Sequence, residues 1–325
     1  MKLGIIGLGR MGANMARRLL KNGHEIVVHT RKKEKIRELE ADGAIPAFSP
    51  EELVSKLKSP RVVWLMLPAG KITEENIDKL KNLLEKDDII VEGGNTYYKD
   101  DIRRGEELKK RGIKYVDAGV SGGIWGLKEG YCTMIGGDKR DFTIIEPAVK
   151  SLAPSGGYMY CGGTGAGHFV KMIHNGIEYA IMEAYGEGFE ILKASPYAKN
   201  LELDKVADMW NNGSVIRSWL LGLLKSAFEK DKNLSAIQGY VEDSGEARWT
   251  VKQAVDSGTA ADVIAASLFK RFNSRQKDVF ANKVNAALRK EFGGHSVAKK
   301  GEEVRSDSAG AGEVRHSEPD KDKRG

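Results

Sequence analysis

Short apolar runs rich in β-branched residues alternate with amphipathic segments over residues 1 to about 160. Such alternation is typical of an α/β domain with a parallel sheet, in which each strand is followed by a helix that returns along one face. Helices are expected at 11–23, where Gly23 provides a C-terminal stop, and at 99–112. The expected strands are 2–6, 25–29, 61–67, 88–94, 114–120 and 131–137.

The strand pattern ends near Gly165, and only helical periodicity follows. The sequence therefore predicts an α/β domain over 1–163 and an all-helical domain over 164–296. Residues 297–325 are rich in Gly, Ser, Ala and mixed charge, and we expect them to be disordered because they contain too little apolar surface to offset ordering. The expected C-terminal helices are 166–193, 204–230, 246–257, 260–273 and 278–291.

Composition excludes several classes of protein. Hydrophobic residues make up 41% of the chain, but none of its apolar runs approaches the roughly 20 residues of a membrane span, and the N-terminus does not resemble a leader. The cysteines, Cys132 and Cys161, lack metal-ligand spacing and are expected to be reduced thiols in a cytoplasmic protein. The net charge of +6 is spread along the chain, so we expect an anionic small substrate and neither nucleic acid nor a membrane.

The segment GLGRMG, residues 7–12, has the spacing of a dinucleotide-binding turn. It directly follows the first expected strand and begins a helix, as this motif requires. Gly7 permits a tight turn, Gly9 lets the backbone approach a pyrophosphate, and Gly12 allows close packing of helix on strand. Leu8, Arg10 and Met11 complete the predicted cofactor-binding turn.

The residues after the second expected strand bear on the choice of dinucleotide. Many NAD-binding domains have an Asp or Glu here for the ribose 2′-hydroxyl. This chain has Thr30, Arg31 and Lys32, which favour the 2′-phosphate of NADP, although NAD stays open because the cations could simply begin a solvated helix.

Five polar side chains share one face of the helix expected at 166–193: Lys171, His174, Asn175, Glu178 and Tyr179. The other positions are largely apolar, so the helix should be buried and this polar face should line a cavity. Burial can lower the pKa of Lys171 into the range of a general base, while Glu178 can act as an acid. Proton abstraction beside hydride transfer suits this pair, and a metal is not expected.

Several separated motifs resemble decarboxylating 6-phosphogluconate dehydrogenase, in its short bacterial-type form and within the β-hydroxyacid dehydrogenase superfamily. The resemblance extends from Met1 to about His295. It implies a Rossmann-type domain, a helical domain, and conversion of 6-phospho-D-gluconate to D-ribulose 5-phosphate, CO₂ and NAD(P)H. Its motifs are GLGRMG, MLPAG (66–70), GGNTYYKDD (93–101), DAGVSGGIWGLKEGYC (117–132), GHFVKMIHNGIEY (167–179) and FGGH (292–295).

The resemblance also implies roles for individual residues. Lys171 takes the proton of the 3-hydroxyl, and Glu178 protonates C1 of the enediol left after decarboxylation. Tyr179 binds the phosphate end of the substrate. The remaining implied contacts are Leu67, Pro68 and Ala69 for the cofactor, Asn95 for cofactor and substrate, and Ser121, Gly122, Gly123, His174 and Asn175 for the substrate.

Near the C-terminus, Arg289 and His295 are six residues apart, as in the pair that the family inserts into a neighbouring subunit's phosphate site. The resemblance thus implies self-association, with Arg271 joining the same site. One departure concerns Ser244, which stands where long-form enzymes carry a lysine, and Arg248 is a possible replacement. Two alternatives remain: another β-hydroxyacid dehydrogenase, such as one acting on 3-hydroxyisobutyrate, and, remotely, a non-catalytic scaffold of the same fold.

Overall fold

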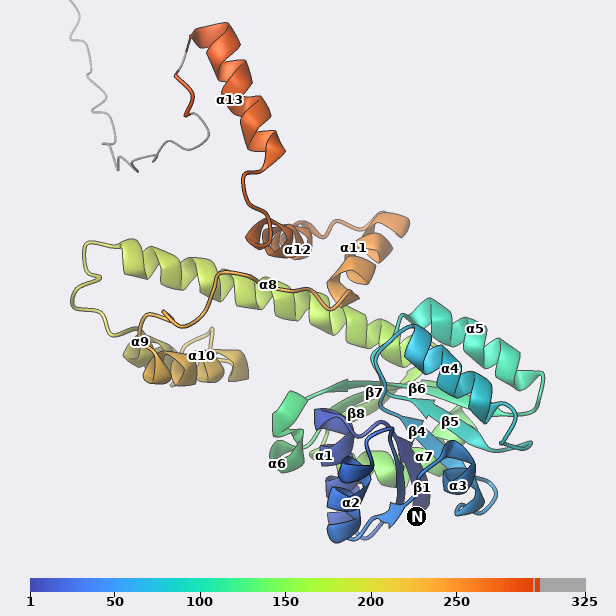
Figure 1. Cartoon of the computed structure of the whole chain (residues 1–325). Coiled ribbons are helices and arrows are strands. Elements are labelled where there is room, and N and C mark those ends of the chain that lie inside the picture. Colours follow the sequence, from blue (N-terminus) through green and yellow to red (C-terminus); the bar gives the residue numbers. More distant parts are fainter. Residues whose placement is uncertain (295, 299–325) are drawn as a thin grey trace, which may run out of the picture. The chain divides into compact units, whose positions relative to one another are not determined.

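A computed structural model describes residues 1–294 and 296–298 of the chain. The chain forms two compact units, Met1–Arg275 and Gln276–Gly325. The first contains the sheet and most helices (Figure 1). Of the second, the structure describes helix α13, Phe280–Gly293. His295 and most of the tail expected to be disordered, 299–325, lie outside the described residues.

Eight strands form one sheet in the order β3-β2-β1-β4-β5-β6-β7-β8. All neighbouring strands are parallel except β6 and β7, which run antiparallel. The central strands are buried on both faces, which explains their continuous apolar runs. The strands are β1 (Lys2–Ile6), β2 (Glu25–His29), β3 (Ile45–Pro46), β4 (Val62–Leu65), β5 (Ile89–Glu92), β6 (Lys114–Ser121), β7 (Cys132–Gly137) and β8 (Tyr158–Gly162).

Two apolar cores lie on opposite faces of this sheet. Along β4, Val62 and Trp64 belong to one core, whereas Val63 and Leu65 belong to the other, as the two-residue period of a strand requires. Helices α1, α2 and α7 contribute to the first core, and α3, α4 and α5 to the second. With the short helix α6, the α-helices of this part of the chain are α1 (Arg10–Lys21), α2 (Lys33–Ala41), α3 (Pro50–Ser55), α4 (Lys71–Leu80), α5 (Tyr98–Lys109), α6 (Gly126–Glu129) and α7 (Lys139–Leu152).

Helix α8, Ala166–Ala194, begins against the sheet and continues into the helical region (Figure 1). Its first turn is fixed by Asp117 of β6, whose carboxylate accepts hydrogen bonds from the backbone N–H of Gly165 at 2.6 Å and of His168 at 2.9 Å. The N-cap residue, Gly165, has no side chain to cap the helix, so the Asp117 carboxylate takes that role. The first turn of α8 is thereby tied to β6 of the sheet.

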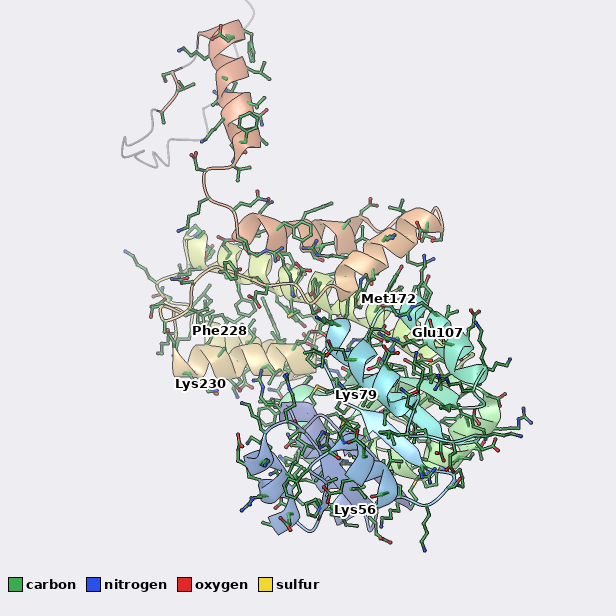
Figure 2. All side chains as sticks on the ribbon, turned by 45° about the vertical axis from the view of Figure 1, so that its right-hand side comes forward. Lys56, Lys79, Glu107, Met172, Phe228 and Lys230 are labelled. Atoms are coloured by element: carbon green, nitrogen blue, oxygen red, sulfur yellow. The ribbon has the colours of Figure 1, made fainter. Side chains whose placement is uncertain are left out.

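The remaining helices of the first unit are α9 (Leu203–Asn211), α10 (Trp219–Lys230), α11 (Glu246–Asp256) and α12 (Asp262–Ser274). Met172, labelled in Figure 2, belongs to the part of α8 that meets α11, and the Thr250 hydroxyl donates to its carbonyl oxygen at 2.7 Å. Phe228 of α10, also labelled there, packs with Phe189 of α8 in a separate apolar cluster. None of the helices in the described residues is long and apolar enough to cross a membrane.

The predicted fold class is confirmed: an α/β Rossmann-type sheet is followed by helices alone. Three details of the prediction are wrong. The sheet is not entirely parallel, β3 and β8 were not expected, and the single helix expected over 204–230 is two helices. The break lies at Gly213, which has a φ of +100°, and Ser218 then caps α10 by accepting from the Leu221 N–H.

Candidate active site

The glycine motif forms the turn between β1 and α1. Gly7 has a φ of +101°, and a Cβ on Gly12 would collide with the Gly7 carbonyl oxygen. In contrast, the space beside Gly9 is open, with no atom within 4 Å of where a Cβ would stand. Gly9 is the N-cap of α1, and no side chain caps this helix. The turn therefore presents free N–H groups to open space, an arrangement that suits a pyrophosphate.

A cavity of about 790 Å³ opens at this turn. Of the predicted cofactor residues it is lined by Leu8, Gly9, Arg10, Thr30, Arg31 and Lys32. Neither Arg31 nor Lys32 has an ion-pair partner among the described residues, and both are exposed. Two exposed cations without ion-pair partners in this part of the structure therefore lie beside Thr30.

A second cavity, of about 960 Å³, lies between the sheet and the helices. Its border with the first is the start of α1, since Arg10 lines one cavity and Met11 the other. Trp219, Leu220 and Leu223 of α10 form part of its wall. The predicted site residues that line it are Asn95, Ser121, Gly122, Gly123, Lys171, His174, Asn175 and Glu178.

Lys171 is one of the residues that line this second cavity. Lys171 as a whole is only 4% exposed, and its Nζ donates to Asn175 Oδ1 at 2.5 Å, one turn along α8. Burial lowers the pKa of Lys171, against the opposing effect of the nearby carboxylates Glu246 and Glu178. A lysine amine with a lowered pKa has a larger neutral fraction near neutral pH and can accept a proton.

His174 and Glu178 lie on the same wall but are more open to solvent. His174 Nδ1 donates to Asn175 Oδ1 at 2.9 Å, and its Nε2 lies 3.3 Å from the Ser121 hydroxyl. The carboxylate of Glu178 is 3.8 Å from His174 Nδ1, and its side chain is 35% exposed. Glu178 is thus free to face a bound molecule.

The expectation that the rest of α8 is buried is wrong in one respect. Ile177 and Ile181 are 49% and 38% exposed, whereas Lys171 and Asn175 are buried. The reason is that these isoleucines line the open cavity together with Glu178. The apolar wall of the cavity and the apolar core of the helical region therefore occupy different faces of one helix.

Asn95 connects two loops beside the cavity. It follows β5 with a φ of +56°, its Nδ2 donates to the Val120 carbonyl oxygen at 3.1 Å, and its Oδ1 accepts from the Val120 N–H at 2.9 Å. This pair of bonds fixes the end of β6, where Ser121 begins the turn through Gly122 and Gly123. The turn is held in place by Asn95 before any ligand arrives.

Tyr179 is brought together with Arg271 and Ser244, and it does not line the second cavity. The Ser244 N–H donates to Tyr179 Oη at 2.8 Å, and the Arg271 guanidinium lies 3.3 Å from the centre of the tyrosine ring. Arg248, the possible replacement for a missing lysine, instead forms a two-bond ion pair with Asp243 at 2.7 and 3.0 Å. Its guanidinium is already paired.

Glu246 was not predicted from the sequence, although it belongs to the same group of residues. It begins α11, is 6% exposed, and its Oε2 accepts from Asn175 Nδ2 and, at 2.8 Å, from the Ser244 hydroxyl. Asn175 and Glu246 are 71 residues apart in the chain, so periodicity could not reveal the contact. The available signal was an acidic residue at the first position of the helix.

A buried charged cluster beneath the start of α8 was also missed. His168 Nδ1 donates to Asp101 at 2.8 Å, and Arg104 Nη1 lies 3.5 Å from Asp101 and 3.9 Å from Glu92. Burial opposes protonation of His168, but Asp101, Glu92 and Asp117 outweigh it and raise the pKa of His168 to about 10. The positive charges that balance these carboxylates are therefore the side chains of His168 and Arg104. The cluster anchors the helix that carries Lys171.

Three predicted cofactor residues of the first unit are not brought to either cavity. Leu67, Pro68 and Ala69 follow β4 at the same sheet edge as Gly7 but line neither cavity. Arg289 lies on α13 in the second unit and is exposed, while His295 lies outside the described residues. Cys132 and Cys161 are both free thiols.

Comparison with known proteins identifies the family. The NAD binding domain of 6-phosphogluconate dehydrogenase matches residues 2–163, and the 6-phosphogluconate dehydrogenase C-terminal domain matches residues 167–310. The chain therefore belongs to the 6-phosphogluconate dehydrogenase family. The C-terminal match supports this family over 3-hydroxyisobutyrate dehydrogenase, the alternative that the sequence left open.

Individual relatives agree with this assignment. YqeC of Bacillus subtilis (strain 168), a proposed 6-phosphogluconate dehydrogenase, is 47% identical over 300 residues, which cover 92% of this chain and 100% of that protein. The NAD(+)-dependent, decarboxylating 6-phosphogluconate dehydrogenase of Haloferax volcanii is 40% identical over 302 residues, 92% of this chain and 99% of its own. The Plasmodium falciparum 6-phosphogluconate dehydrogenase, solved alone, with NADP+ and with 6-phosphogluconate, superposes with a TM-score of 0.77 at 28% identity, covering 94% of this chain and 67% of that one.

Proposed function

We propose that this protein catalyses the oxidative decarboxylation of 6-phospho-D-gluconate to D-ribulose 5-phosphate and CO₂, with reduction of a nicotinamide dinucleotide. One observation carries the proposal beyond family membership: the buried amine of Lys171 opens on a cavity that borders the dinucleotide cavity. Glu178 lies on the same wall, so a base and an acid face one bound molecule.

The bound dinucleotide supplies the acceptor for the hydride that leaves C3 of the substrate. Neutral Lys171 accepts the proton of the 3-hydroxyl at Nζ. Burial lowers the pKa of Lys171 and so enlarges the neutral fraction that can accept this proton. The resulting 3-keto acid loses CO₂, since the new carbonyl accepts the electrons of the breaking bond. Glu178 then donates a proton to C1 of the enediol, which tautomerises to the ketose.

The residues around Lys171 have binding roles in this proposal. The hydroxyl of Ser121 and the N–H groups of Gly122 and Gly123 hold the sugar acid, beside Asn95. His174 and Asn175 orient the hydroxyls. Tyr179 and Arg271, which lie against one another, serve the phosphate end. The guanidinium stacked on the ring is aligned by that contact and by a 2.9 Å bond to the Glu242 carbonyl oxygen.

For the cofactor we propose a preference for NADP. The support is the pair of unpartnered cations, Arg31 and Lys32, at the edge of the first cavity, next to the neutral Thr30. Similar proteins differ in this respect: the Haloferax volcanii enzyme is named as NAD(+)-dependent, and the Plasmodium falciparum enzyme was solved with NADP+. The charges at positions 31 and 32 are therefore the feature to test.

We also propose that the site is completed by self-association. Arg289 is exposed on α13, and the guanidinium of an arginine can form two charge-assisted bonds to a phosphate. In this proposal Arg289 and His295 of one subunit serve the phosphate end of the site in another. Such an arrangement predicts that no single subunit is fully active.

The proposed activity is tested by absorbance of the reduced nicotinamide. The protein is mixed with NADP or NAD and either 6-phosphogluconate or 3-hydroxyisobutyrate, and kcat/KM is measured for each pair. We expect 6-phosphogluconate to be the better substrate with both dinucleotides and to yield CO₂. A higher kcat/KM with 3-hydroxyisobutyrate would overturn the proposal.

A further inference from the structure

The carboxylate of Glu246 is connected to Lys171 through a single amide. Asn175 Oδ1 accepts from Lys171 Nζ at 2.5 Å, while Asn175 Nδ2 donates to Glu246 Oε2. All three residues are less than 9% exposed. A chain of amine, amide and carboxylate therefore crosses from α8 to α11 inside the protein.

This connection fixes which way the amide of Asn175 points. A carboxylate oxygen accepts hydrogen bonds, so the NH₂ group must face Glu246 and the oxygen must face Lys171. If the amide rotated by half a turn, its NH₂ would face the Lys171 ammonium, which accepts no hydrogen bond, and its oxygen would face a carboxylate. Both contacts would be unfavourable, and burial would increase their cost.

Glu246 does not line the second cavity. Its Oε2 is occupied by Asn175 and by the Ser244 hydroxyl, and its Oε1 is buried without a hydrogen-bond partner among the described residues. A buried carboxylate with one unpartnered oxygen is costly to the fold. That cost suggests a role other than stability.

We propose that Glu246 is a positioning residue that acts through Asn175: its carboxylate orients the amide whose oxygen accepts from the Lys171 amine, and it places a negative charge behind that amide. The inference rests on the proposed function of Lys171 as the base. Glu246 itself touches neither substrate nor cofactor.

Other groups also face Lys171, and the charge of Glu246 acts among them. They are Glu178 on α8 itself and Cys132 on β7, while His174 shares the Asn175 amide oxygen with Lys171. Glu246 is the largest of the charges that raise the pKa of Lys171, while burial lowers it. Removing this charge should therefore lower the pKa further.

Glu246→Gln separates the charge from the hydrogen bonds. The amide oxygen can occupy the position of Oε2 and keep both donors, and the NH₂ group falls where Oε1 has no partner. Glu246→Ala removes both the charge and the acceptor, which leaves Asn175 free to turn. The matched control is Glu183→Gln, which removes a carboxylate of α8 that pairs with Lys270 at 3.4 Å.

The test follows kcat/KM for 6-phosphogluconate across pH. Activity falls at low pH because Lys171 becomes protonated, so Glu246→Gln should move this acidic limb down by roughly one pH unit. At a pH well below this limb, kcat/KM is expressed as a fraction of each protein's own maximum. This fraction should be roughly tenfold larger for Glu246→Gln than for the parent. Glu246→Ala should in addition lower the maximum, and Glu183→Gln should match the parent. An unchanged limb in Glu246→Gln, or an equal shift in Glu183→Gln, would overturn the proposal.

A second measurement needs no substrate. Competitive labelling of amines with trace acetic anhydride, read by peptide mass spectrometry across pH, reports the pKa of Lys171 directly, and Glu246→Gln should lower it. If the parent does not turn over 6-phosphogluconate, the proposed function fails while the labelling still decides the role of Glu246. Equal labelling curves for parent and Glu246→Gln would count against that role. Thermal unfolding of each variant confirms that it is folded.

Discussion

The amine of Lys171 and the amide oxygen of Asn175 are joined by a 2.5 Å hydrogen bond across one turn of α8. The bond uses one N–H of the lysine and leaves the rest of the amine toward the cavity that both residues line. A base held by a neighbour on its own helix loses little conformational entropy when substrate arrives. The geometry of the base is therefore present in the protein before a ligand binds.

Lys171→Met should abolish hydride transfer while dinucleotide binding stays nearly intact. The methionine fills a similar volume but accepts no proton, so kcat should fall by roughly 10²–10⁴-fold. Absorbance of the reduced nicotinamide measures the rate, and fluorescence titration measures dinucleotide binding. Lys193→Met, at an exposed lysine of the same helix, is the control and should behave as the parent. Equal turnover of Lys171→Met and parent would refute the assignment of the base.

Glu178→Gln should mainly slow the steps after oxidation. The amide cannot donate the proton that C1 of the enediol requires, so a step later than hydride transfer becomes rate-limiting. With substrate deuterated at C3, the isotope effect on kcat should therefore shrink toward one. The exposed residue Glu187 gives the control, Glu187→Gln. If kcat and the isotope effect are unchanged, Glu178 is not the acid.

The architecture was largely predictable because local patterns determine it. Each strand and the helix after it can be predicted from residues that are neighbours in the chain. The apolar runs of β1, β4 and β5 are continuous because these strands are buried on both faces of the sheet. The direction of β7 was not predictable, since a buried apolar run has no feature that distinguishes parallel from antiparallel pairing. The break at Gly213 was missed because the apolar pattern continues on both sides of it.

The site was predictable where its residues share one element. Lys171, His174, Asn175 and Glu178 line one cavity because helical spacing places them on one face, which the sequence shows directly. Glu246 and the cluster around His168 come from distant segments, and only tertiary packing brings them together. Tyr179 was grouped with these residues by its angle on the helix, yet it contacts Arg271 and Ser244 and does not line the cavity.

Arg31→Ala should weaken NADP binding far more than NAD binding. The guanidinium has no partner in the described residues and would contact a group that only NADP carries. Loss of charge-assisted hydrogen bonds should cost about 1.5–3 kcal/mol, or roughly 10–100-fold in the ratio of kcat/KM values. Arg37→Ala on the exposed side of α2 is the control. An unchanged NADP to NAD ratio would remove Arg31 from the proposed phosphate contact.

Mixing two impaired variants tests whether subunits share a site. Arg289→Ala lacks the proposed phosphate contact but has Lys171, and Lys171→Met lacks the base but has Arg289. In a mixed assembly the site with an intact Lys171 receives Arg289 from the other chain and should recover activity. Free exchange within dimers at equal amounts would restore roughly a quarter of the parent rate, because half of the dimers are mixed and each has one complete site. Co-expression of the two variants and assay at low substrate concentration provide the measurement. A rate equal to the average of the separate variants would show that Arg289 serves only its own chain or no site at all.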